Sequence, residues 1–191
     1  MVRPVPDLPL LRWGEQLRRT QIRCRRQRRY LGAGGIGLGL LLATFLPAPI
    51  PRLVWNASAS VPVGLYVVSP GAAVRVGDRV IARVPAAVRR LAAARHYIPA
   101  NVPLVKQVVA VSGDSVCALG QAIVINGRWV AARRVHDGEG RAMPWWHGCV
   151  TLQDQAVFLL MAGNPDSFDG RYFGPTDAAD LLGTARLVWA R

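Results

Sequence analysis

Hydrophobic and polar residues follow three different patterns along this chain of 191 residues. Up to residue 29 arginine dominates, from Tyr30 to Pro51 there is no charged residue, and beyond that short apolar runs alternate with turn residues. The stretch Tyr30–Leu46 reaches the lower limit of about 17 apolar residues for a membrane-spanning helix, and the prolines that follow would end it. We therefore expect a basic tail over residues 1–29, a transmembrane helix over residues 30–51 and a folded domain over residues 52–191.

The folded domain is predicted to consist of short strands. Runs of β-branched and aromatic residues bounded by glycine and proline indicate strands, at residues 64–68, 74–84, 104–111, 122–130, 156–161 and 186–189. Gly77-Asp78 divides the second run, and Asn126-Gly127 in the fourth suits a two-residue type I′ turn. The one strong helix candidate is Ala86–Arg95. Strands and helices do not alternate as in a parallel sheet, so we expect a mainly β, antiparallel fold with a closed or semi-closed sheet.

The net charge of +13 is concentrated in the tail, where nine arginines face only Asp7 and Glu15. Such a tail suits nucleic acid or a membrane, and its place beside an uncharged segment favours the lipid bilayer over nucleic acid as partner. The one-sided charge predicts a cytoplasmic N-terminus, with residues 52–191 on the periplasmic side of a bacterial inner membrane. A cleaved signal peptide is disfavoured by the long basic prefix and by the lack of a small-residue cleavage site.

The three cysteines fit this topology. Cys24 would remain a thiol in the reducing cytoplasm, whereas Cys117 and Cys149 would both lie outside, where a disulfide is possible. The sequence leaves open whether their Cα atoms are close enough. The histidines, together with Cys149, show no paired ligand spacing, so no metal site is expected.

Lys106 is the one lysine of the chain, among 23 arginines. Lysine, unlike arginine, can lose its proton when it is removed from water. Lys106 lies among valines in a predicted strand, which makes it a candidate for a neutral amine that acts as a base. An ordinary surface lysine is the alternative.

Two other segments carry hydroxyl groups that suit such a base. Ser58 and Ser60, one residue apart before Pro62, would point the same way on an extended chain, so one hydroxyl can attack while the other donates a hydrogen bond. Taken alone, this segment would be interpreted as an ordinary polar loop after a membrane helix, which is common. The loop after the fifth strand contains Ser167, which could orient an amine, and Asp169 and Arg171, which are spaced for a local ion pair.

The order of these features resembles the type I signal peptidase family of Ser/Lys proteases. The motifs are Asn56-x-Ser-x-Ser-x-Pro-x-Gly-x-Tyr66, Lys106 in a strand closed by Gly113-Asp114, and the Gly163-Asn164 loop. The first of them resembles the TraF-type branch, which processes pilins in conjugative transfer. General signal peptidases usually carry Ser-Met-x-Pro and Gly-Asp-Asn-Arg at these places, and both departures favour the specialised branch.

The resemblance implies a signal-peptidase-like β fold and a role for each motif residue. Ser60 would be the nucleophile and Lys106 the general base, with Ser58 as oxyanion donor and Ser167 orienting the lysine. Asp169 and Arg171 would support the loop.

The resemblance also implies a serine endopeptidase without cofactor that acts on a membrane-tethered precursor, a pilin or a protein with a signal peptide. Its product would be released by hydrolysis or by cyclisation. A non-catalytic component of a conjugation or secretion assembly and a general type I signal peptidase are the alternatives.

Overall fold

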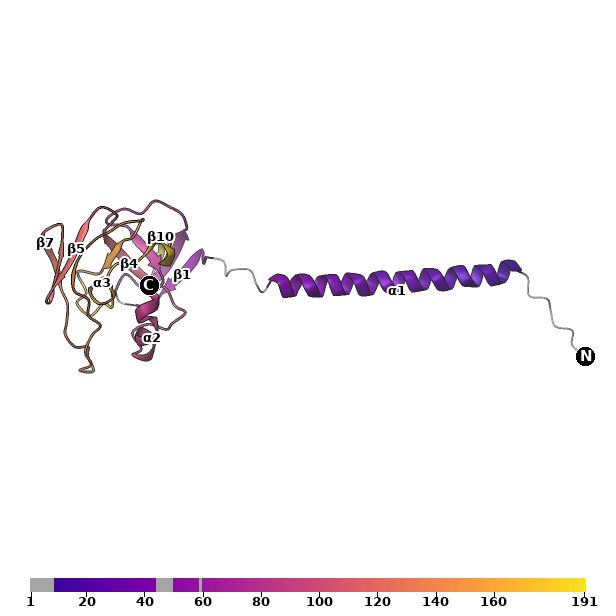
Figure 1. Ribbon diagram of the computed structural model, residues 1–191, viewed down its shortest axis with the longest axis horizontal. Coiled ribbons are helices and arrows are strands. Elements are labelled where there is room, and N and C mark those ends of the chain that lie inside the picture. Colours follow the sequence, from indigo (N-terminus) through magenta and orange to yellow (C-terminus); the bar gives the residue numbers. More distant parts are fainter. Residues whose placement is uncertain (1–8, 44–49, 59) are drawn as a thin grey trace, which may run out of the picture. The chain divides into compact units, whose positions relative to one another are not determined.

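The computed structural model describes residues 9–43, 50–58 and 60–191, and the chain divides into two units, Met1–Pro49 and Ile50–Arg191 (Figure 1). The first unit contains one continuous helix, α1 (Pro9–Ala43). Its arginines from Arg18 to Arg29 are exposed to solvent. The Arg26 side chain lies over the Tyr30 ring and donates a hydrogen bond of 3.1 Å to its hydroxyl.

The expected transmembrane helix is not found in the part of the chain that the structure describes, where no helix is both long and apolar enough to cross a membrane. The uncharged part of α1 begins at Tyr30, and the described helix ends at Ala43. A bilayer-spanning stretch of about 20 residues that ends there must include the arginines of the preceding turns. Residues 44–49, which also belong to the predicted span of residues 30–51, lie outside the described residues.

Residues 50–191 form two antiparallel sheets with short helical segments (Figure 1). The larger sheet has the strand order β1-β2-β10-β3-β4-β9 and the smaller β7-β6-β5-β8. The larger sheet consists of β1 (Leu53–Asn56), β2 (Gly64–Ser69), β3 (Arg79–Ala82), β4 (Leu104–Ala110), β9 (Phe158–Leu160) and β10 (Leu181–Ala190). The smaller sheet consists of β5 (Ser115–Leu119), β6 (Ala122–Ile125), β7 (Arg128–Ala132) and β8 (Gly148–Thr151). The helical segments are α2 (Ala86–Ala94), α3 (Gly170–Phe173) and the 3₁₀ turn η1 (Ala178–Asp180).

The mainly β, antiparallel prediction is confirmed, but two of its details are wrong. Instead of the expected closed or semi-closed sheet, the strands form two separate sheets. Of the run 74–84, only Arg79–Ala82 forms a strand, because the Asp78 carboxylate accepts the Arg75 N–H (2.9 Å) and folds the preceding residues into a turn. The helix at 86–95 and the type I′ turn are confirmed, the latter by positive φ angles at both Asn126 and Gly127.

The smaller sheet buries one face, as expected for an antiparallel sheet with one solvated side, whereas strands β3, β4 and β9 of the larger sheet bury residues on both faces. The larger sheet buries alternate apolar residues of its central strands, among them Tyr66, Val68, Ile81, Val105 and Leu182. The smaller sheet packs on a cluster that includes Val116, Ile123, Phe158 and Leu160. β9 therefore belongs to the larger sheet by hydrogen bonding and contributes to the core beneath the smaller one.

Candidate active site

The loop that carries Ser60 is held by a buried asparagine. Asn56, the last residue of β1, donates from its side-chain amide to the carbonyl oxygens of Ser58 (2.9 Å), Val61 (3.2 Å) and Pro62 (3.2 Å). Its carbonyl oxygen accepts the Ser58 N–H at 3.2 Å. One side chain thus binds both ends of a short loop, which fixes the backbone on either side of Ser60. Asn56 is part of the first sequence motif, but its role in holding the loop was not predicted.

Strand β2 fixes the point at which this loop returns to the sheet. The buried Tyr66 donates from its hydroxyl to the Pro62 carbonyl oxygen at 2.9 Å. Gly64 pairs with Asn56 on one side and with β10 on the other. A Cβ at residue 64 would lie 2.1 Å from the Trp189 carbonyl oxygen, so only glycine allows β10 to come this close.

Ser58 and Ser60 lie beside each other in the loop. The Ser60 N–H points to the Ser58 Oγ, at 3.4 Å. Ser60 is half-buried, whereas Ser58 is exposed to solvent. A backbone N–H and a hydroxyl group are therefore adjacent to the Ser60 side chain, in a loop rather than on the extended chain that the spacing suggested.

Lys106 lies in the middle of β4, opposite Val80 of β3, and only 4% of its surface is exposed. Its Nζ lies 3.1 Å from the Ser60 Oγ and 2.5 Å from the Ser167 Oγ, and donates to both in this structure. Ser60 is 46 positions and Ser167 is 61 positions away from Lys106 in the sequence, yet both hydroxyl groups contact its amine. The alternative of a surface lysine is excluded by this burial.

The surroundings of Lys106 favour its neutral form. Burial lowers the pKa of the amine from 10.5 to about 8, the negative charge of Asp169 opposes this change, and the positive charge of Arg171 adds to it. Desolvation dominates because a charged ammonium group loses its hydration inside the protein. An amine with a pKa of about 8 is available as a base near neutral pH, unlike an ordinary lysine.

Ser167 is placed by a buried ion pair. Asp169 and Arg171 are at most 1% exposed, and their side chains are joined by two hydrogen bonds of 2.8 and 2.9 Å. Arg171 also donates to the carbonyl oxygens of Asn164 (2.6 Å) and Ser167 (3.3 Å). Asp169 accepts the Met161 N–H at 3.0 Å and the Arg171 N–H at 3.2 Å, which caps the first turn of α3. The pair therefore determines the shape of the loop that presents the Ser167 hydroxyl.

A cleft of about 400 Å³ opens over Ser60 and Lys106. Ser58 and Ser167 line it too, and the rest of the lining is largely apolar, with Trp55, Ile98 and Val102 on its sides. An extended peptide with small or apolar side chains fits a cleft of this character.

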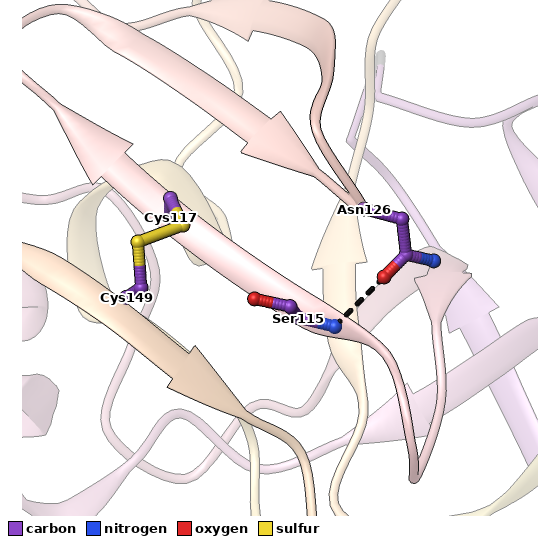
Figure 2. The surroundings of a disulfide bond; sticks show 4 residues. All are labelled: Ser115, Cys117, Asn126 and Cys149. Carbon is purple, nitrogen blue, oxygen red and sulfur yellow. Dashed lines mark hydrogen bonds between the residues drawn. A yellow bond between two sulfur atoms is a disulfide. The ribbon is translucent and has the colours of Figure 1, made fainter.

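The structure brings the predicted site residues Ser58, Ser60, Lys106 and Ser167 to one cleft, with Asp169 and Arg171 directly behind it. Cys117 and Cys149 are joined by a disulfide on the smaller sheet, away from this cleft (Figure 2). Among the described residues, no group of three or more metal-ligating side chains is present.

Comparisons with known proteins agree on one family. Residues 28–190 match the family model described as signal peptidase, peptidase S26. A probable conjugal transfer protein TraF of Sinorhizobium fredii is 34% identical over 167 residues, which cover 79% of this chain and 87% of that protein. A plasmid transfer protein TraF of Escherichia coli is 31% identical over 178 residues, which cover 87% of this chain and 99% of that protein.

One solved structure, a signal peptidase I of Enterococcus faecalis, aligns with 59% of this chain and 97% of its own. The identity is 19% and the TM-score 0.33, a likeness too weak to assign the fold.

Proposed function

We infer the function from the family: the chain belongs to the signal peptidase (peptidase S26) family, and we propose that it is a membrane-anchored serine endopeptidase with a Ser60–Lys106 dyad. The observation that carries the proposal is the buried Lys106 amine, 3.1 Å from the Ser60 hydroxyl oxygen. A nucleophile and a base within hydrogen-bond distance, with a third group orienting the base, are what covalent acyl transfer requires.

The proposed reaction proceeds in two stages. The neutral Lys106 amine takes the Ser60 hydroxyl proton while the oxygen attacks the scissile carbonyl carbon. The tetrahedral intermediate then collapses, the C–N bond breaks, and the leaving amine takes the proton from the Lys106 ammonium group. The acyl-Ser60 ester is released by water or by an amine of the substrate, which Lys106 deprotonates in turn.

The loop geometry supports a role for Ser58 in stabilising the oxyanion. The Ser58 hydroxyl and the Ser60 N–H are adjacent, at 3.4 Å. We propose that both donate to the carbonyl oxygen as it becomes negatively charged, the Ser60 N–H leaving the Ser58 oxygen for the substrate. Donors that bind the carbonyl oxygen before it becomes negatively charged contribute strongly to the rate.

We propose an exported precursor, in the first place the pilin of a conjugative transfer system, as the substrate. Relatives with 31–34% identity are named for conjugal or plasmid transfer, which supports this class. The departures from the general signal peptidase motifs at Ser60-Val61-Pro62 and Gly163-Asn164-Pro165 support a specialised enzyme. A non-catalytic component of a transfer assembly would have the same fold, but it would have no need of a buried amine beside a serine.

The proposed activity is tested with the purified full chain and a library of peptides derived from a bacterial proteome. We expect cleavage at a restricted set of sites, identified by mass spectrometry, with a product one water lighter if the acyl-enzyme is resolved by cyclisation. Ser60→Ala should give no cleavage, because the nucleophilic oxygen is removed, and Ser69→Ala, at an exposed serine of β2, should act as wild type. Cleavage by Ser60→Ala at the same sites would refute the dyad.

We further propose that the segment 30–51 attaches the chain to the inner membrane, with the N-terminus in the cytoplasm. The arginines on one side of this uncharged segment support that orientation. Cys24 is exposed on α1 and is the one free cysteine, the other two being joined in a disulfide. A membrane-impermeant maleimide should therefore label Cys24 only after spheroplasts are lysed.

The matched control places the thiol in the second unit. In a Cys24→Ser/Ser69→Cys variant, the exposed residue 69 should be labelled in intact spheroplasts. Labelling of Cys24 in intact spheroplasts would contradict the proposed topology.

A further inference from the structure

Arg133, a buried cation outside the cleft, joins three separate segments. It follows β7 and is 1% exposed. Its guanidinium group donates to the carbonyl oxygens of Gly120 (2.9 Å), Trp146 (2.8 Å) and Arg171 (3.4 Å). The same group lies 3.6 Å from the centre of the Trp145 ring, a cation–π contact. Arg133 thus links the turn after β5, the segment before β8 and helix α3.

Trp146 makes a second link from the same segment to α3. Its indole N–H donates to the Gly170 carbonyl oxygen at 3.0 Å, and its ring packs edge-on against Phe158. No side chain fits at residue 170, because a Cβ there would lie 2.7 Å from the Leu159 carbonyl oxygen, so the backbone of α3 packs directly against β9. The position of α3 is therefore fixed by its close packing on β9 and by the hydrogen bond from Trp146.

The contacts on α3 lead directly to the lysine. Gly170 and Arg171, whose carbonyl oxygens accept these bonds, form the turn that Asp169 caps. From this turn Arg171 donates to the Ser167 carbonyl oxygen, and the Ser167 hydroxyl contacts the Lys106 amine. A displacement of α3 therefore changes the position of the one hydroxyl group that orients Lys106 besides Ser60.

The Cys117–Cys149 disulfide, drawn in Figure 2, joins β5 to β8. Arg133 and Trp146 both lie in the stretch of chain between the two cysteines. The two cysteines face each other on neighbouring strands, β5 and β8. All four residues of β8 are exposed, so this edge strand is held by its backbone pairing and by the disulfide rather than by a hydrophobic face. Because Trp146 lies two positions before the start of β8, the disulfide limits how far its indole can move.

We propose, on the basis of the function proposed above, that Arg133 and Trp146 are positioning residues that hold the Ser167 loop against Lys106, and that the Cys117–Cys149 disulfide is required for them to do so. The smaller sheet would then help to position Lys106, although it contributes no residue to the cleft. The lysine geometry would be complete only after the disulfide has formed, that is, in an oxidising compartment.

The test compares Trp146→Phe, which keeps an aromatic ring and removes the N–H donor, with Trp129→Phe. Trp129 lies on β7 of the same sheet and is 67% exposed. Because Lys106 is the one lysine, ¹³Cε-lysine labelling of the full chain gives one NMR signal, whose titration reports on the amine. In Trp146→Phe the loosened loop admits water to the amine, so the midpoint should rise, and reduction of the disulfide in wild type should have the same effect. Trp129→Phe should titrate as wild type.

Activity supplies the second readout, with the best peptide from the library at a temperature well below the melting point of each variant. Trp146→Phe should lower kcat by roughly 3- to 10-fold, the loss of one hydrogen bond, and leave KM unchanged because no cleft residue is altered. An unchanged midpoint in both Trp146→Phe and reduced wild type would overturn the proposal, as would a loss confined to KM. Cleavage by Ser60→Ala, or the absence of cleavage by wild type, would instead refute the proposed function. The titration of Lys106 would then still test whether Trp146 and the disulfide position the Ser167 loop.

Discussion

Replacement of Lys106 by methionine is expected to lower kcat/KM by a factor on the order of 10³, the usual contribution of a positioned base. Methionine has nearly the same length and remains compatible with the buried site, but its thioether sulfur is not basic enough to take the Ser60 proton. Lys106→Arg should be equally inactive, because arginine keeps the charge and does not lose its proton in proteins. The measurement is the rate of cleavage of the best library peptide.

The stability of Lys106→Met separates lost catalysis from lost structure. In wild type, the lowering of the Lys106 pKa from 10.5 to about 8 means that burying the charged amine costs about 3 kcal/mol at neutral pH. Its removal offsets the loss of a hydrogen bond to Ser167, so the variant should melt no earlier than wild type at pH 7. Between about pH 8 and pH 10.5 the unfolded chain binds more protons than the folded one, because Lys106 is already neutral in the folded protein. The stability of wild type therefore rises with pH in this window. The methionine variant should lack this rise, and wild-type activity in it would refute the assignment of the base.

Removal of either partner of the Asp169–Arg171 pair is expected to destabilise the protein by about 3–5 kcal/mol, because the remaining charge is buried and unpaired. Both side chains are at most 1% exposed, and together they satisfy the backbone of residues 161–171. Asp169→Asn and Arg171→Met should therefore lower the urea midpoint strongly. Tryptophan fluorescence follows the transition, since five of the six tryptophans lie in residues 50–191.

An exposed ion pair provides the control for this experiment. Glu139 pairs with Arg141 at 2.7 Å, but its side chain is 69% exposed. Solvent screens such a pair, so Glu139→Gln should change the stability by less than about 1 kcal/mol. Equal effects of Glu139→Gln and Asp169→Asn would show that the buried pair has no special role in the loop.

The sequence predicted the parts of this protein whose local pattern is strong. The runs of β-branched and aromatic residues in β2 and β4 and the alanine-rich α2 are visible over a few residues. The grouping of Ser60, Lys106 and Ser167 followed from the resemblance of three short motifs. Spacing alone would not bring Ser60 and Ser167 to the amine of Lys106, because they lie 46 and 61 positions away from it in the sequence.

Other features depend on contacts between distant segments and had no local signal. β8 has four exposed residues and therefore no apolar alternation, so pairing with β5 alone makes it a strand. Asn56 looks like an ordinary loop residue, yet it binds three carbonyl oxygens. Arg133 is one of 23 arginines, and only tertiary packing distinguishes it from the exposed ones.

The central claim, that Lys106 is a buried amine able to act as a base, is tested most directly by its own titration. The full chain labelled with ¹³Cε-lysine gives a single lysine signal, which needs no assignment because the sequence contains one lysine. We expect the signal of the folded protein to titrate with a midpoint of about 8, and that of the urea-unfolded chain near 10.5. A midpoint near 10.5 in the folded protein would contradict the claim.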